Sequence, residues 1–223
     1  MFWKKVNRGL LLGAALLVFL VGFIVVKEVR FRKETPLIKE RVETYLADLC
    51  SLQCGVSGEL GKTLSTEAQD LQKDKLDRVL AEHWYGNLPD DEYDGIGVSN
   101  LRANYESYLS DRVNVLFTKA EMHLQEDNLR VYKDGPDRAV VGLSADIKTE
   151  YAGDGDEFFF GTSNHAVYED EYYSQEAPDL SGKAYSGVFT INMTFELERV
   201  GGAWKIVAFN GYGYESTSSE KGE

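Results

Sequence analysis

The sequence predicts an α+β protein: an apolar N-terminal transmembrane helix, then helices packed on a curved antiparallel sheet. Three observations lead to this prediction. Residues 9–26 form an uncharged apolar run, and residues 36–109 place apolar side chains at helical spacing. Residues 116–208 then change to the two-residue period of strands. Helices first and long strands afterwards are typical of segregated helical and β layers rather than of alternating βαβ units.

The apolar run predicts a membrane anchor. Residues 9–26 contain 18 residues without a charge, which is about 27 Å of helix and close to the thickness of a bilayer core. The alternative is a cleaved signal peptide, but the run exceeds the usual length and no A-x-A site follows it. We therefore expect contact with membrane lipid through residues 9–26, flanked by a basic cytoplasmic tail (1–8) and a basic juxtamembrane linker (27–35).

The orientation of this anchor depends on its flanking charges. Three Lys and Arg precede the apolar run and four follow it, so the positive-inside rule gives nearly a tie. Because a short cationic tail is easily retained inside, we expect the tail in the cytoplasm and the rest of the chain outside it, at the inner or plasma membrane. Gly9 and Gly13 have the spacing of a helix-dimer contact, which leaves a homo-oligomer among the expected partners.

The rest of the chain is acidic and large enough for a core. The protein has 223 residues, a net charge of −13, 43% hydrophobic and 12% aromatic residues. From residue 34 onward, 17 Lys and Arg face 36 Asp and Glu. This composition excludes a fully disordered chain and argues against nucleic acid as a partner.

Three helices are predicted before the sheet. The first follows Pro36 and ends at Gly55 and Gly58. The second begins at Ser65, whose side chain can accept from free amides, and the third spans residues 99–109. Their expected buried residues are Ile38, Val42, Tyr45, Leu49 and Leu52 in the first helix, Leu71, Leu76, Val79, Leu80 and His83 in the second, and Leu101, Tyr105 and Tyr108 in the third.

The strands are predicted from alternation. Asp134-Gly135-Pro136 marks a turn, and Gly201-Gly202 joins two alternating runs as in a β-hairpin. The stretch 154–180 is expected to add a strand near 158–160, and residues 215–223 are expected to be a disordered tail. The inward residues are expected to be Leu116, Thr118, Ala120, Met122 and Leu124 in the first strand, Ala139, Val141, Leu143, Ala145, Ile147, Thr149 and Tyr151 in the next, and Phe189, Ile191, Met193, Phe195, Leu197, Trp204, Ile206 and Ala208 in the hairpin.

Two stretches resemble a known superfamily. GVSNLRANYESYLSDRVNVLFTKAEMHL, followed by LRVYKDGPDRAVVGLSADIKTEY, resembles the middle of a SnoaL-like, nuclear-transport-factor-2-like domain. FTINMTFELERVGGAWKIVAFNGY is similar to the closing hairpin of that superfamily. The resemblance covers about residues 36–214 and implies a curved sheet wrapped around helices, a cone with a pocket at its open end. Such folds host many unrelated functions.

The resemblance and the topology together give three expectations of function. The first is a membrane-anchored, non-catalytic binding domain in the bacterial cell envelope, with an envelope protein or a small apolar ligand as partner. The second is an assembly component of a conjugation or type IV secretion apparatus, because VirB-type inner-membrane proteins are similar in topology. The third is an anchored SnoaL-like isomerase or cyclase, which would need an acid in an apolar pocket.

No catalytic set, cofactor or metal site is expected. Asp146 is expected on the more solvent-exposed face of its strand, His123 at an outward strand position and His165 in a polar loop. His83 is expected at the edge of the core, with its polar atoms satisfied. The run Asp90-x-Glu92-x-Asp94-Gly95 resembles the start of a calcium loop but has Leu101 at its twelfth position, where a bidentate Glu is required.

Two groups of residues are left with alternative interpretations. Cys50 and Cys54 lie four apart, too distant for a disulfide within a regular helix. They would form a disulfide only if the helix unwound at Leu52. Otherwise they are free or buried thiols, or a two-thiol metal or redox site. Several aromatic residues are either core or the lining of a pocket for an apolar ligand: Trp84, Tyr85, Tyr105, Phe117 and Trp204.

Overall fold

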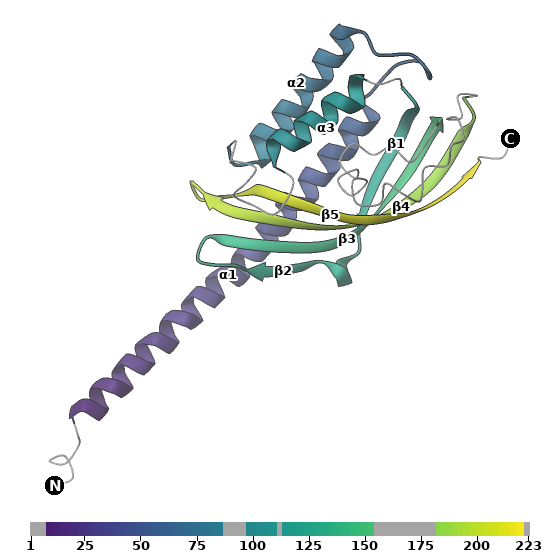
Figure 1. The fold of residues 1–223 in the computed structure, drawn as a ribbon. Helices are drawn as coiled ribbons and strands as arrows, with labels where there is room; N and C mark the ends of the chain where they lie inside the picture. The colour runs from purple at the N-terminus through teal and green to yellow at the C-terminus, as the bar shows by residue number, and fades with distance from the viewer. Residues whose placement is uncertain (1–7, 87–96, 111–112, 154–181, 221–223) are drawn as a thin grey trace, which may run out of the picture.

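A long helix, two shorter helices and an open antiparallel sheet make up the protein (Figure 1). The computed structural model describes residues 8–86, 97–110, 113–153 and 182–220, of which 211–220 by backbone alone. The elements are, in chain order, α1 (Arg8–Cys54), α2 (Thr66–His83), α3 (Val98–Ser110), β1 (Val115–Leu124), the 3-10 turn η2 (Glu126–Asn128), β2 (Arg130–Lys133), β3 (Arg138–Gly153), β4 (Ala184–Val200) and β5 (Ala203–Glu220).

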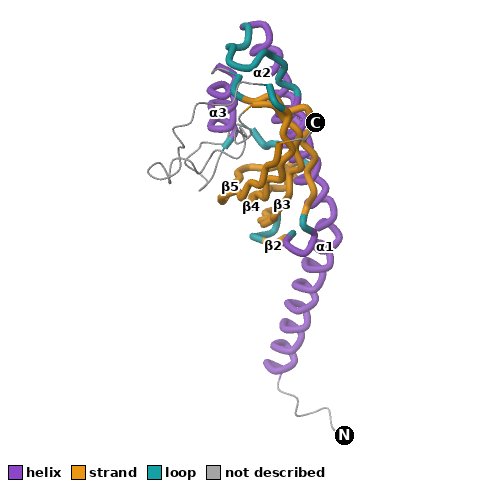
Figure 2. Tube along the Cα trace, turned by 90° about the vertical axis from the view of Figure 1, so that its right-hand side faces the viewer, coloured by secondary structure: helices purple, strands orange, loops and turns teal. Residues whose placement is uncertain are grey.

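Helix α1 extends from the apolar N-terminal run into the core without a break. Its 47 residues correspond to about 70 Å. Every residue from 9 to 26 is exposed, and this part is long and apolar enough to cross a membrane, a criterion that a signal sequence also meets. Beyond Pro36 the predicted stripe is confirmed: Ile38, Val42, Tyr45 and Leu49 are fully buried. Figure 2 shows α1 projecting from the body at its N-terminal end and running along the sheet at the other.

The stretch 27–35, expected as a linker between two elements, is part of this helix. Ion pairs one turn apart join Glu28 to Arg32 and Arg30 to Glu34, each at 3.1 Å. Phe31 packs against the core, and Glu34 also accepts from Arg199 of β4 at 2.7 Å. Pro36 has no backbone N–H and so removes one hydrogen bond from α1. The contacts of Glu28, Phe31 and Glu34 stabilise the helix on the N-terminal side of this proline.

The sheet has the order β1-β3-β4-β5, with all neighbours antiparallel. Strand β2 continues the edge formed by β1, pairing with β3 beyond the η2 turn. The expected inward residues of β3 and β4 are all buried, which confirms their alternation. Val200 pairs with Ala203 across Gly201 (φ 59°) and Gly202 (φ 90°), a two-residue turn that needs positive φ at both positions.

Strand β1 departs from the predicted alternation. Val115 and Phe117 are buried, whereas Thr118 is exposed and Leu116 only half-buried. A bulge between Phe117 and Lys119 inserts one unpaired residue and reverses which side chains face the core. The expectation that Thr118 faces inward is therefore wrong, while Leu116, Ala120, Met122 and Leu124 are partly buried and pack at the border of the core.

The C-terminal strand is longer than predicted. We expected a disordered tail from residue 215, but β5 continues to Glu220 by pairing with the first half of β4 as far as Tyr185. Strong alternation stops near residue 209, so the sequence lacked the signal that pairing with β4 supplies. The strand expected at 158–160 lies outside the described residues.

Helix α2 begins where predicted, but not every residue of its predicted buried face is buried. Ser65 is the N-cap and accepts from the amide of Ala68. Leu76 is 2% exposed, as expected, whereas Leu71 is 55% exposed and Gln72 is buried in its place. Gln72 lies there because its amide donates to the carbonyl of Gly55 at the end of α1. A buried polar residue can thus shift a helix face by one position.

This assignment of the α2 face predicts unequal effects of two leucine truncations. Leu76→Ala should lower the free energy of unfolding by about 2–5 kcal/mol, because it leaves a cavity in the core. Leu71→Ala should change it by less than about 0.5 kcal/mol. Urea unfolding of residues 27–223, followed by circular dichroism, measures both. Equal losses for the two variants would contradict the assignment.

Candidate functional site

A hollow of about 410 Å³ opens between α1, the C-terminal end of α2 and the turn between β4 and β5. This volume is within the range of small-molecule sites. Its wall combines an exposed leucine, several charged groups and the edge of a buried tryptophan. The lining residues are Leu37, Glu40, Arg41, Thr44, Glu82, Gly202, Ala203 and Trp204.

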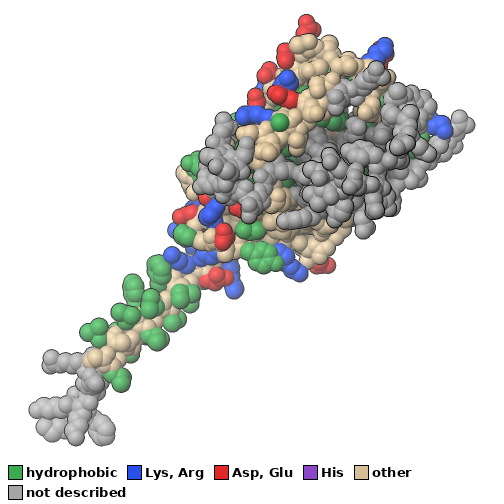
Figure 3. Space-filling view, viewed as in Figure 1, with side chains coloured by type: hydrophobic (Ala, Val, Ile, Leu, Met, Phe, Trp, Pro, Cys, Tyr) green, Lys and Arg blue, Asp and Glu red, His purple; other side chains and the backbone are tan. Residues whose placement is uncertain are grey.

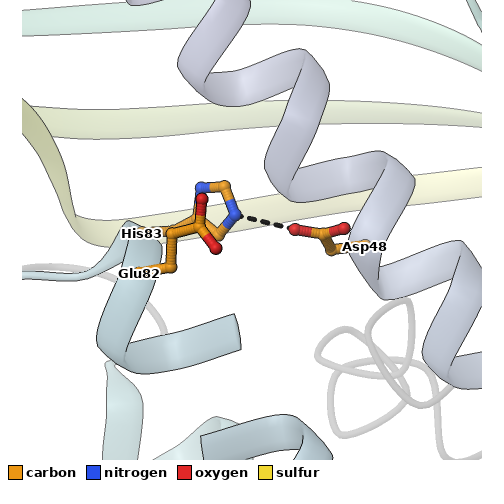
Figure 4. Close-up of side chains that lie close together, drawn as sticks. All are labelled: Asp48, Glu82 and His83. Atoms are coloured by element: carbon orange, nitrogen blue, oxygen red, sulfur yellow. Dashed lines mark hydrogen bonds and ion pairs between the residues drawn. The ribbon is translucent and has the colours of Figure 1, made fainter. Parts of the chain in front are cut away.

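A hydrogen-bond network centred on His83 joins α1 to α2 beside this hollow (Figure 4), and two of its residues, Arg41 and Glu82, line the hollow. The Nε2 atom of His83 lies 2.8 Å from Oδ2 of Asp48. The guanidinium of Arg41 lies 3.1 Å from Nδ1 of the same ring. Because a guanidinium only donates, Nδ1 accepts from Arg41 and Nε2 carries the hydrogen that is donated to Asp48. Both ring nitrogens are thereby engaged, and the ring is fully buried.

The same network satisfies the C-terminal end of α2. The carbonyl oxygen of Glu82, in the last turn, accepts from Arg41 at 3.4 Å and from the ammonium of Lys205 on β5. Carbonyls of the last turn lack partners within the helix, and positive charge there is favourable to the helix dipole. Directly after α2, the amide of Tyr85 donates to the carbonyl of Ile206 at 3.0 Å. The end of α2 is thus held by both α1 and β5.

The electrostatics of the site favour a neutral His83. Burial lowers the pKa of His83 below its ordinary value, and the charge of Arg41 lowers it further, whereas the hydrogen bond to Asp48 acts in the opposite direction. Burial also lowers the pKa of Lys205, with Arg41 contributing. A proton added to His83 would remove the acceptor of Arg41 and place two positive charges side by side.

Asp48, Glu82 and His83 are also the one group of potential metal ligands found among the described residues. Their ligand atoms lie within 4.8 Å of one another. Imidazole and carboxylate together suit zinc and similar ions. A cation bound here, however, would displace the hydrogen bond between His83 and Asp48 and would lie beside the guanidinium of Arg41. The observed donors and acceptors therefore satisfy one another better than they would hold a metal.

The predicted aromatic lining is divided among three places. Trp84 packs in the core, with ring centroids 6.0 Å from Tyr45 and 6.1 Å from Phe209. Tyr105 is buried on α3, and Phe117 is buried on β1. Tyr85 is 41% exposed. Of the five residues, Trp204 alone borders the hollow, so the ligand-binding role of the set stays a prediction.

Cys50 and Cys54 are free thiols near the end of α1. The helix remains regular through Leu52, so the unwinding that a disulfide would need does not occur. Burial raises the pKa of Cys50 to about 12 and also raises that of Cys54. Both thiols are therefore protonated at neutral pH, which disfavours metal binding and redox chemistry.

Other sequence candidates lie elsewhere. Asp146 is on the outer face of β3, where it accepts from Thr190 at 2.6 Å and from Gln125; these bonds lower its pKa. His123 is exposed on β1, as expected. The acidic run at 90–95 and His165 lie outside the described residues.

Three residues of the network, Arg41, Asp48 and Lys205, are not predicted from the sequence. Arg41 and Asp48 are seven residues apart, two helical turns, and so share one face of α1 beside the apolar stripe. That spacing is the one available signal for them, but it names no partner. Lys205 is brought to the site by the pairing of β4 with β5.

The network predicts that stability falls in mild acid. The folded-state pKa of His83 lies below the ordinary value of 6.5, so the unfolded chain binds a proton that the folded chain does not. Stability present above about pH 6.5 is therefore lost as the pH falls below it. Urea midpoints of residues 27–223 at about pH 7.5 and about pH 5.5 should differ in the wild type and much less in His83→Gln.

His123→Gln is the matched control, because His123 is exposed on β1. It should retain the wild-type dependence on pH. The same dependence in all three proteins would show that His83 is not the group responsible.

Comparison with known proteins adds no identification. No protein-family model matches the chain, and no curated protein matches it. The hollow, its buried network and the exposed apolar part of α1 are thus the features from which a function can be inferred.

Proposed function

We propose that the protein is a single-pass membrane protein that holds a non-catalytic binding domain outside the cytoplasm of a bacterial cell. The observation that carries this proposal is the continuity of α1. Its apolar part makes no buried contact with the body, and from Ile38 onward one face of the helix is buried in the core. A helix of this kind ties the position of the folded body to that of the anchor.

The exposure of residues 9–26 supports the anchor. Large apolar side chains point outward around the whole helix, for example Leu12 (69% exposed), Phe19 (73%) and Ile24 (63%). Such a surface is costly in water and favourable in lipid, where a helix satisfies every backbone group internally. The basic residues on both sides of the segment are typical of the ends of a membrane span.

A binding role is favoured over catalysis by what the core contains. An isomerase of the SnoaL-like kind would need a desolvated carboxyl group. The buried polar side chains of the described residues are Gln53, Gln72, His83 and Thr149, and Asp48 beside His83 is half-exposed. The hollow, in contrast, offers a surface of mixed charge and apolar character suited to a ligand or a partner segment.

Kinship with SnoaL-like, nuclear-transport-factor-2-like domains is part of this proposal. Helices followed by an open antiparallel sheet with a closing Gly-Gly hairpin support it. A role as an assembly component of a type IV secretion or conjugation apparatus is the second candidate. This second role is favoured by the order of the elements: an apolar segment, the basic stretch 27–35 and an α+β body.

Fractionation of bacterial cells that express the full chain tests the proposal. The chain should remain in membranes through an alkaline carbonate wash, and protease added to intact spheroplasts should digest the body. Leu16→Arg with Phe19→Arg should release it, since each arginine at mid-span costs about 2.5–3.5 kcal/mol. Leu16→Ala with Phe19→Ala is the matched control and should stay in the membrane.

Three results would contradict the proposal. A soluble protein shortened by its apolar segment would show a cleaved signal peptide. A body protected from protease would place it in the cytoplasm. Turnover of ketosteroids or polyketide-like ketones by residues 27–223 would show that the domain is an enzyme.

A further inference from the structure

We propose that the base of the domain, where α1 enters the body, docks on the anionic phospholipid headgroups of the membrane that holds the anchor. The inference rests on the proposed function, because it requires residues 9–26 to lie in a bilayer. The docking surface, named here the basal surface, consists of exposed side chains from two elements: Lys27, Arg30 and Lys33 on α1, and Arg130, Tyr132 and Lys133 on β2.

Strand β2 lies at the height of the headgroups. The ammonium of Lys133 is 5.7 Å from the centre of the Phe31 ring, so β2 is level with this residue of α1. Phe31 follows the apolar run by five residues, a rise of about 7.5 Å. The headgroup layer on each side of a bilayer is roughly 5–8 Å thick. An inserted anchor therefore brings β2 into this layer.

The height of β2 is fixed by the structure rather than by a flexible connection. Phe31 packs against the core, and Arg199 on β4 bonds to Glu34 at 2.7 Å with both side chains largely buried. Helix α1 is continuous from the apolar run through these contacts. The basal surface is thus presented to the membrane without a further loss of conformational freedom, which favours binding.

The chemistry of the basal surface suits anionic lipid. Tyr132 is 59% exposed, and tyrosine is enriched at membrane interfaces because its ring is amphipathic. Basic side chains near an anionic membrane are attracted to it within about one Debye length. Figure 3 shows blue and green side chains, with some red ones among them, where α1 enters the body.

Some of the acidic residues near the basal surface are engaged in ion pairs and others are exposed. Glu28 pairs with Arg32, and Glu34 pairs with Arg30 and Arg199. Asp134 and Asp137, in the turn between β2 and β3, and Glu126 and Asp127, in the η2 turn before β2, are exposed and oppose docking. The rest of the body is strongly acidic, so an anionic membrane repels its other faces and favours contact through the base.

Quenching of a fluorophore at position 132 tests the inference in the full chain. The background is Cys54→Ser, because Cys54 is half-buried and Cys50, at 3% exposure, is shielded from labelling. Labelled Tyr132→Cys is placed in nanodiscs of phosphatidylcholine with or without phosphatidylglycerol. Quenching by neutral acrylamide should decrease in the anionic discs. Labelled Ser107→Cys, on the exposed face of α3 at the far end of the body, should be quenched equally in both.

A charge reversal supplies the second measurement. Lys133→Glu, added to Tyr132→Cys, should weaken docking about 25-fold, because it removes one positive charge and adds one negative charge, and each charge near an anionic surface changes binding about fivefold. Lys75→Glu on α2 makes the same change of charge away from the base and should leave the protection intact.

The outcomes separate docking from anchoring. A chain that is embedded in the discs but equally quenched at 132 with and without phosphatidylglycerol would overturn the docking and leave the anchor standing. Equal protection of Lys133→Glu and its parent would also overturn the docking. A chain that does not co-purify with discs would overturn the anchor, and the docking with it.

Discussion

The packing of α1 against the sheet is the constraint on which the rest of the structure depends. Ile38, Val42, Tyr45 and Leu49 bury one face of this helix completely. Helix α2 is bonded to its flank, and β5 is bonded to the end of α2. The same helix carries the apolar N-terminal segment, so this segment and the core are parts of one continuous helix. The proposed position of the body relative to a membrane follows from that continuity, as does the proposed docking of β2 on the headgroups.

The buried network around His83 is a second consequence of α1. Arg41 and Asp48 lie two turns apart on one face of the helix and bind opposite nitrogens of a single imidazole ring. Both residues bind the end of α2, and Arg41 also lines the hollow. The arrangement joins α2 to α1, and Arg41, which stays protonated, cannot take a proton from Nδ1. The pH dependence of the contact follows from the same burial.

Much of the fold can be predicted from local pattern, and the departures have physical causes. The alternation of β3 and β4, the Gly-Gly turn and the Ser65 cap are dictated by nearby residues and are confirmed. A bulge changes the face of β1, Gln72 replaces Leu71 in the core, and pairing with β4 extends β5, all through contacts distant in sequence. The site was less predictable: His83 stood out on an amphipathic helix, but its partners come from α1 and β5.

The most direct test of this account is the distance between two spin labels on α1 of the full chain in nanodiscs. Val21 (52% exposed) and Glu43 (also exposed) are separated by 22 residues, about 33 Å along a continuous helix. Labels at these two sites in the Cys54→Ser background should give a single narrow distribution of distances near that value. A broad distribution, or a shorter mean, would show a flexible connection between residues 27 and 36 and would contradict the rigid union of anchor and core.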